Sequence, residues 1–445
     1  MIDRMADAAG KLLALAKEAG ADAADVLAVA GEAIDVELRD GVTEKLERSE
    51  DRDFGLRVLV GQSQAVVSTS RDDAASLRTA AERAVAMAKA APPDDFAGLA
   101  ASDSIALTWP ELMLADDAAP DAAALVEQAR AAEAAGREVP GVTRSNGASA
   151  SASRRRILLI ASNGFAGSYQ RTAYGISASL IAGTGTAMER DHDWHSALHW
   201  KSLRQPGDIG RVAGERAVRR LGPRKVPSGK VPVMFENRIA GGLAGHLVGA
   251  ILGSGIARGT SFLKDSMGQL LFRPEISIID DATIRRGLAS KPFDAEGRAT
   301  RPTPIIAEGR LVSWLLDEHS ARQLGQTSTG HASRGTSGPP SPQPTNVTLS
   351  AGSRSREALL RDTGRGLLVT ELIGMGVNGV TGDYSRGAAG FWIEDGAIAY
   401  PVSEITIASN LKTMFRELEP ADDLELRGAI NAPSLLVPEM TLAGT

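Results

Sequence analysis

Cysteine is absent from this chain of 445 residues. A chain without thiols forms no disulfide, holds no metal through thiolates and has no cysteine nucleophile. Absence of disulfides suits a reducing compartment. We therefore expect a cytoplasmic protein.

Long apolar runs are also missing. No stretch of the sequence approaches the roughly 18 consecutive apolar residues that a membrane-spanning helix needs. Residues 1–20 include acidic side chains and lack the unbroken apolar core of a signal peptide. The sequence therefore predicts no membrane partner.

Positive charge is sparse, since the formal net charge is −6 and no basic block occurs. The one basic run, Arg154–Arg156, leads directly into the apolar residues 157–160, which is typical of a strand edge. Proteins that bind nucleic acids carry a basic patch or stripe. We therefore expect no nucleic-acid partner.

Apolar residues make up 43% of the chain, which is enough for a large core, and the length favours two or three domains. The order helix, alternating strands, helix is predicted twice in the first half. An Asp-Gly pair at Asp40-Gly41 predicts a hairpin between two of these strands. The predicted helices cover residues 3–19, 72–90, 120–135 and 206–221, and the predicted strands cover 25–30, 33–39, 43–50, 53–60, 64–70, 142–151, 154–162, 164–171, 174–182 and 186–200.

These patterns predict an α+β fold in three parts. Residues 1–92 and 118–222 are interpreted as two similar lobes, each a helix, a β-meander and a helix. After a linker at 223–230, residues 223–445 are predicted to form a β-rich domain with few helices.

Residues 235–265 contain apolar side chains at helical spacing and one histidine, His246. Glycine recurs at every fourth position, and each glycine in a helix costs roughly 1 kcal/mol relative to alanine. Such a cost predicts the close approach of another backbone, which side chains would block. The glycines are Gly241, Gly245 and Gly249.

His192, His195 and His199 form the densest group of potential metal ligands. On a helix they would share one face, which suits a metal site. On a strand His192 points away from the other two. The flanking alternation favours a strand, so a metal here is the less favoured interpretation.

The run Gly374-Met375-Gly376-Val377-Asn378-Gly379 matches the dinucleotide fingerprint but is not followed by a helical pattern. A turn beside a cleft is the better interpretation. Asp383, Tyr384 and Arg386 follow it, either as turn residues or as a substrate-facing group. His331 lies in a segment rich in Ser, Gly and Pro, residues 326–345, that suits a surface loop over a cleft.

Several long runs between residues 223 and 445 resemble the PmbA branch, also called TldE, of the TldD/PmbA family. They are GHLVGAILGS, TSFLKDSMG, GLASKPFDAEG, WLLDEHSARQLG, STGHA, LLVTELIGMGVNGVTGDYSRGAAGFWIEDG and YPVSEITIASNLKTMF. The resemblance covers essentially all of this region in order. The first half resembles the family's N-terminal organisation less specifically.

The resemblance implies a bacterial or archaeal cytosolic protein that pairs with a TldD sibling in a peptide-cleaving complex. TldD subunits bind zinc through His-Glu-x-x-x-His and a later cysteine. Here Gly241 and Gly242 replace the first histidine and the glutamate, and only His246 matches. We therefore expect zinc in the TldD partner, none in this chain, and His246 held by a hydrogen bond.

The favoured hypothesis is a non-catalytic subunit of a TldD/TldE metallopeptidase that shapes the cavity for peptides or unfolded chains. One alternative is an independent metal-dependent hydrolase that uses His192, His195 and His199. Another is a homodimeric regulatory binding protein. The family's older label, modulator of DNA gyrase, has no support in this acidic chain. The residues expected to face substrate or partner are Gly374, Gly376, Asn378, Asp383, Tyr384, Arg386 and His331.

Overall fold

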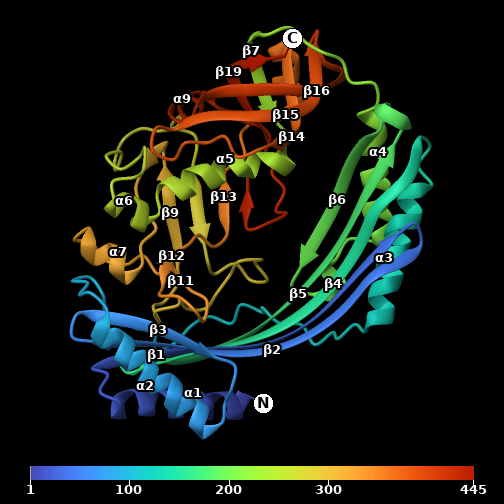
Figure 1. Ribbon diagram of the computed structural model, residues 1–445. Coiled ribbons are helices and arrows are strands. Elements are labelled where there is room, and N and C mark those ends of the chain that lie inside the picture. The colour runs from blue at the N-terminus through green and yellow to red at the C-terminus, as the bar shows by residue number, and fades with distance from the viewer. Residues whose placement is uncertain (1, 445) are drawn as a thin grey trace.

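The structure is a computed structural model that describes residues 2–444. Its N-terminal half forms one antiparallel six-stranded sheet in the order β3-β2-β1-β4-β5-β6 (Figure 1). The strands are β1 (Ala23–Arg39), β2 (Val42–Val60), β3 (Ser63–Thr69), β4 (Val142–Ala161), β5 (Ala166–Ala182) and β6 (Glu189–Ala197).

Helices cover the outer face of this sheet at its two ends, and the concave face turns toward the C-terminal part (Figure 1). Leu12 of α1, Leu77 of α2 and Phe54 of β2 are fully buried in the core at one end. Leu125 of α3 and Ile209 of α4 are fully buried at the other. The helices are α1 (Ile2–Glu18), α2 (Ala74–Ala90), α3 (Ala122–Arg137) and α4 (Pro206–Arg219), with short 3-10 turns η1 (Gly185–Ala187) and η2 (Trp200–Ser202).

The strands are longer than the sequence predicts. The predicted strands 25–30 and 33–39 are one strand, β1, and 43–50 and 53–60 are one strand, β2. Between the predicted segments, the alternation of buried and exposed side chains stops at polar residues. The backbone pairing of β1 with β2 nevertheless continues from Ala23↔Leu59 to Arg39↔Val42. The predicted hairpin is confirmed, with Asp40 at φ 50° and Gly41 at φ 80°, the left-handed values that a tight hairpin turn needs.

The two predicted lobes share one sheet. β1 pairs with β4 from Asp25↔Ala161 to Leu38↔Ala148, so each meander covers the inner edge strand of the other. Glu133 on α3 also accepts hydrogen bonds from the backbone amides of Asp40 (2.8 Å) and Gly41 (2.7 Å). Pairing removes two exposed sheet edges, and the two meanders therefore form a single structural unit.

The C-terminal part is β-rich, as the sequence predicts. In its larger sheet, pairing of β16 with β19 closes β16, β15, β14, β7 and β19 into a small barrel. Its other main sheet has the order β10-β9-β8-β13-β18. The strands are β7 (Gly229–Phe235), β8 (Ile278–Asp281), β9 (Pro302–Ala307), β10 (Arg310–Leu311), β11 (Ala332–Ser333), β12 (Ser341–Pro342), β13 (Val347–Leu349), β14 (Gly366–Ile373), β15 (Asp383–Glu394), β16 (Ala397–Asn410), β17 (Glu419–Pro420), β18 (Ile430–Asn431) and β19 (Leu435–Ala443).

Helix α5 (Asn237–Ala250) contacts β13, β14 and β18, which places it between the barrel and the open sheet. Leu243 and Leu247 are buried in a core shared with both sheets. The other helices are α6 (Gly253–Ala257), α7 (Glu318–Gln323), α8 (Arg356–Thr363) and α9 (Leu411–Glu417). Between residues 2 and 444 no helix combines the length and the apolar composition needed to cross a membrane.

Candidate functional site

A cavity of about 390 Å³ lies along the open edge of α5. Gly245, His246 and Gly249 form its floor. Its walls come from the chain that follows α5, from the connection between β14 and β15, from β15 itself and from the start of α9. The wall residues are Ala250, Leu252, Ser254, Gly255, Arg258, Thr260, Ser261, Phe262, Met375, Val377, Gly379, Arg386 and Leu411.

The glycines of α5 have different surroundings. A Cβ built on Gly241 would lie 2.7 Å from the carbonyl oxygen of Ile430. The predicted close approach of another backbone is therefore confirmed at Gly241. It is wrong at Gly245, where only a side-chain carbon of Ile430 lies within 4 Å, at 3.8 Å, and at Gly249, where nothing does, because both glycines border the cavity. Gly242 also faces open space.

His246 is held by a ring contact. Its imidazole meets the ring of Tyr384 edge to face, with centroids 5.9 Å apart and planes at 75°. Among residues 2–444 its ring nitrogens have no hydrogen-bond partner, so the expected hydrogen bond is not formed within this chain. Burial, assisted by the charge of Arg386, lowers the pKa of His246, and the ring is therefore neutral at pH 7.

The glycine-rich segment after β14 is a turn, as predicted, and no helix follows it. The φ of Gly374 is 78°, and a Cβ on Gly376 would lie 1.8 Å from the carbonyl oxygen of Ser385. Asn378 Oδ1 accepts a hydrogen bond from the amide of Val380 at 2.9 Å. The chain therefore folds back tightly on the start of β15, and the segment offers no helix N-terminus to a nucleotide phosphate.

The sequence leaves two interpretations open for Asp383, Tyr384 and Arg386, as turn residues or as a substrate-facing group. The structure does not treat the three residues alike. Asp383 accepts hydrogen bonds from Thr381 Oγ1 (2.6 Å) and Asn410 Nδ2 (3.1 Å), which lower its pKa. Asp383 begins β15, and its carboxylate is engaged within the chain. Tyr384 is 1% exposed, burial raises its pKa, and its hydroxyl has no hydrogen-bond partner within residues 2–444. Only Arg386 lines the cavity itself.

Sequence reasoning did not single out Met375 or Arg258. Met375 is 90% exposed at the rim, and Arg258 follows α6. A long apolar side chain inside a glycine-rich turn is the one signal that could have indicated Met375, because turns seldom expose methionine.

His331 is not on an exposed loop. It is 2% exposed, its Nδ1 lies 2.8 Å from Thr329 Oγ1, and its Nε2 lies 3.5 Å from the carboxylate of Asp280. The expectation that it faces substrate or partner from a surface loop is wrong, because β11 and β12 pair and hold the segment down.

His192, His195 and His199 do not converge. His192 and His195 lie on strand β6, three positions apart and therefore on opposite faces. His199 lies beyond the strand, with Nε2 2.9 Å from the carbonyl oxygen of Met113. Across residues 2–444 no three His, Cys, Asp or Glu side chains are grouped as metal ligands. The hypothesis of a hydrolase built on these histidines is not supported.

The residues at α5 do not fit a zinc ion either. A catalytic zinc keeps three protein ligands and one open position. The resemblance assigns the ligand positions on this helix to Gly241 and His246, and glycine offers no ligand. Backbone from β18 occupies the space beside Gly241.

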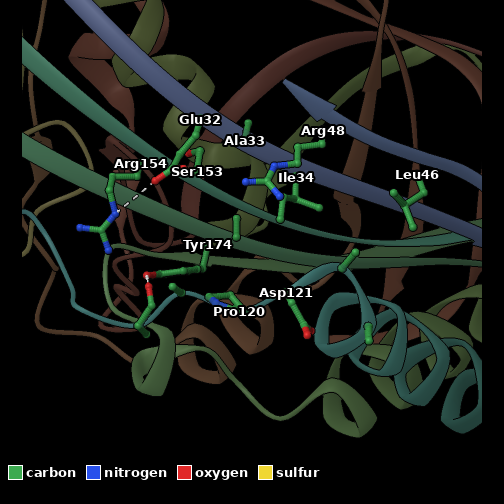
Figure 2. Close-up of a pocket in the computed structure, with 15 residues that line it drawn as sticks. Glu32, Ala33, Ile34, Leu46, Arg48, Pro120, Asp121, Ser153, Arg154 and Tyr174 are labelled. Carbon is green, nitrogen blue, oxygen red and sulfur yellow. Dashed lines mark hydrogen bonds and ion pairs between the residues drawn. The ribbon is translucent and has the colours of Figure 1, made fainter. Parts of the chain in front are cut away.

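A second cavity, of about 460 Å³, lies on the long sheet beside residues 118–123 (Figure 2). Its polar side chains have partners inside the chain. Arg154 lies 3.7 Å from Glu32, and the Tyr174 hydroxyl donates to the carbonyl oxygen of Ala118 at 2.6 Å. These contacts leave little polar chemistry for a ligand.

The fold and the first cavity define a class of protein. It is an α+β chain with one long antiparallel sheet in its first half and a β-rich C-terminal part that carries a pocket beside one glycine-rich helix. Models of PmbA/TldA metallopeptidase domain 1, central domain and C-terminal domain match residues 24–88, 115–221 and 228–444. The chain belongs to the PmbA/TldA metallopeptidase family, the TldD/PmbA family named above, as a PmbA-type member.

Relatives match almost the whole chain. It is 38% identical to the metalloprotease PmbA of Escherichia coli O157:H7 over 426 residues, 95% of this chain and 92% of that protein. It is also 38% identical to a metalloprotease PmbA homolog of Haemophilus influenzae over 433 residues, 97% and 94% of the two chains.

Solved structures have the same fold. The crystal structure of a candidate modulator of DNA gyrase from Bacteroides thetaiotaomicron matches with a TM-score of 0.90 and 26% identity over 99% of both chains. TldE from Thermococcus kodakarensis matches with a TM-score of 0.85 over 98% of this chain and all of that one. Its 20% identity supports the fold alone.

Proposed function

We propose that this chain is the non-catalytic subunit of a TldD/TldE-type metallopeptidase and acts in proteolysis of peptides or unfolded chains. In this proposal the TldD-type sibling supplies zinc and catalysis. The chain itself contributes the pocket beside α5 and shapes what enters the shared cavity. Membership of the family does not by itself assign different roles to the two siblings. This proposal places catalysis on the TldD-type sibling and the positioning of substrate on this chain.

One observation carries the proposal: the contact between Gly241 and the backbone of Ile430. A Cβ 2.7 Å from a carbonyl oxygen cannot be accommodated without movement of β18. Overpacking of this kind typically costs 1–3 kcal/mol. The packing around Gly241, which stands where the TldD motif has its first histidine, thus favours glycine over histidine.

The pocket has the chemistry of a peptide-binding surface. Met375 and Val377 offer apolar contacts, and Arg258 and Arg386 add two cations. A concave site with apolar walls and a few polar groups is the usual form of a ligand site. The lining holds one imidazole, His246, and no carboxylate. The pocket can therefore orient a chain, but it does not supply the carboxylate that activates water in the zinc motif.

The test is a peptide-cleavage assay of this chain, of its TldD-type sibling, and of the co-purified mixture with zinc present. We expect the mixture to cleave unfolded peptides and this chain alone to be inactive. Activity of the chain alone at the rate of the mixture would sink the proposal. Failure of the sibling to co-purify, together with a dimer of this chain in sedimentation, would favour the homodimeric alternative.

A pocket variant sharpens the test. In the mixture, Arg386→Ala is expected to raise KM for peptides about tenfold with kcat nearly unchanged, as loss of uniform binding does. The matched control is Arg130→Ala, an exposed arginine on α3 that pairs only with Glu127 at 2.7 Å. Equal effects of the two variants would show that the pocket does not face substrate.

A further inference from the structure

A third cavity, of about 500 Å³, lies between the concave face of the long sheet and two segments of the C-terminal part. The segments are residues 291–295 and 332–335. Four cationic side chains line it, while Asp294 is the one acidic side chain in the lining. The cations are Arg155, Arg171, Lys291 and Arg334.

Arg155 and Arg171 face each other directly across β4 and β5. Like charges in this arrangement destabilise a sheet. Burial lowers the pKa of Arg171, and the neighbouring charge of Arg155 lowers it further. Neither arginine forms an ion pair within the described part of the chain, and Arg171 Nη1 reaches only the carbonyl oxygen of Ser290 at 3.5 Å.

Arg334 closes the inner end of the cavity. Its side chain is wholly buried, and its Nη2 lies 2.5 Å from Asp25. Asp25 also accepts a hydrogen bond from Arg57 Nε at 2.8 Å, so one carboxylate serves two guanidinium groups. The Nε and Nη1 atoms of Arg334 have no hydrogen-bond acceptor among residues 2–444. These donors are enclosed by the protein and do not reach the cavity, so Arg334 adds positive charge behind its wall.

The nearby carboxyl groups of Asp294 and Glu296 accept hydrogen bonds from backbone amides. Asp294 accepts from the backbone amides of Glu296 and Arg298, both at 2.9 Å, and from that of Ala332 at 3.2 Å. Burial, assisted by Asp294, raises the pKa of Glu296 well above its ordinary value, which favours a neutral carboxyl group. Lys291 Nζ donates to a carbonyl oxygen, that of Ala332, at 2.9 Å.

The rest of the wall is apolar and aromatic. It is formed mainly by Leu27, Val29, Ile157, Leu159, Tyr169 and Phe293. Arg155 and Gly335 are exposed at the open end, whereas Arg334 is buried at the inner end. A ligand of matching chemistry therefore has an apolar body and one anionic group.

We propose that this cavity binds the carboxylate of a peptide beside an apolar side chain, with Arg155 and Arg171 as its anion partners and with Lys291 and Arg334 as positive charge behind them. The choice of a peptide rests on the proposed function, while the anionic character rests on the four cations. A carboxylate accepts charge-assisted hydrogen bonds from guanidinium groups, often in pairs. The carboxylate comes either from the C-terminus of the chain or from an acidic side chain.

The test is fluorescence anisotropy with the purified full chain, without its sibling and without cleavage. Three labelled hexapeptides ending in phenylalanine are compared: a free acid without acidic side chains, its C-terminal amide, and the same amide with one internal glutamate. We expect the plain amide to bind at least about tenfold more weakly than the best carboxylate peptide, the value of one charge-assisted hydrogen bond. The better of the two carboxylate peptides identifies the source.

Arg155→Gln and Arg171→Gln are each expected to weaken binding of that peptide about tenfold, and Arg155→Lys is expected to retain most of it. The matched control, Arg48→Gln, changes an exposed arginine on β2 that pairs with Glu50. The proposal is overturned if the plain amide binds equally well, or if the Arg155 and Arg171 variants match the control. Because no cleavage is measured, this result is independent of whether the mixture with the sibling is a peptidase.

Discussion

Two glycines that are adjacent in sequence on α5 differ in the space available for a side chain. Gly241 packs against the backbone of β18, whereas Gly242 faces open space. Gly241→Ala is expected to lower the free energy of unfolding by about 1–3 kcal/mol, because its Cβ would lie 2.7 Å from the Ile430 carbonyl oxygen. Urea unfolding followed by circular dichroism measures this loss.

Gly242→Ala is the internal control. Alanine is favoured over glycine in a helix by roughly 1 kcal/mol, and nothing obstructs the new methyl group. This variant is expected to be as stable as the parent or up to about 1 kcal/mol more stable. If both substitutions destabilise the chain equally, the difference between the two positions is not the packing described above.

At the residue scale, the sequence predicted the features that depend only on residues close together in the chain. The Asp40-Gly41 turn follows from the backbone angles those two residues tolerate. Gly241 and Gly242 could be assigned to vacated motif positions. The burial of His331 could not be predicted, because it depends on Asp280, which lies 51 positions earlier in the chain and meets it only in the folded state.

At the scale of elements, Asp280 on β8 holds the segment that ends at Thr345. It is fully buried and accepts a hydrogen bond from the Thr345 amide at 2.8 Å, besides contacts with the Thr345 hydroxyl and His331. Burial acts to raise the pKa of Asp280, but the contacts with His331 and Thr345 outweigh it, and the pKa is lowered.

This lowered pKa predicts the direction of a pH effect. A carboxyl group with a lower pKa in the folded state contributes stability above its unfolded pKa of about 3.9 and loses it as pH falls further. Asp280→Asn is expected to lower the free energy of unfolding at pH 7 by about 3 kcal/mol. It is also expected to reduce the loss of stability between pH 5 and pH 3. Urea unfolding at several pH values measures both effects.

Asp265→Asn, at an exposed position, is the matched control. It should leave both the stability at pH 7 and the pH dependence within about 0.5 kcal/mol of the parent. An Asp280→Asn variant with the pH profile of the parent would contradict the role of Asp280.

Element boundaries were predicted less well than element types. Alternation predicted strands in the first half correctly, but it split β1 and β2 at their polar centres. Residues 42–51 of β2 are exposed on both faces of the sheet, yet their backbone pairing with β1 continues. Backbone pairing does not require an apolar face, so the hydrophobic pattern alone could not show that the strands are continuous.

At the scale of the molecule, the shared sheet could not be predicted from either meander alone. Pairing of β1 with β4 depends on two segments more than 100 residues apart. The cavity with four cations has the same origin, since the sheet supplies two arginines and the C-terminal part supplies Lys291 and Arg334. The two proposed binding sites therefore depend on the contact between the two halves as much as on α5.

That contact depends on Phe165, which lies between β4 and β5 and is 2% exposed. Its ring meets Phe293 at 5.0 Å and Trp109 at 6.1 Å, and a Cβ on Gly297 would lie 2.5 Å from its Cγ. Phe165→Ala is expected to cost about 3–5 kcal/mol. Because the lost contacts join the two halves, we also expect the thermal unfolding transition to separate into two.

Phe54→Ala is the control that distinguishes a weaker contact between the two halves from a general loss of stability. Phe54 is fully buried between the sheet and α1 and α2, in a core that contains no residue of the C-terminal part. Its removal should cost a similar amount, but it should destabilise the sheet half without weakening the contact with Phe293. Differential scanning calorimetry distinguishes the two variants. If Phe165→Ala and Phe54→Ala give the same pattern of transitions, the aromatic contact does not couple the halves, and the cavity beside it depends on other contacts for its shape.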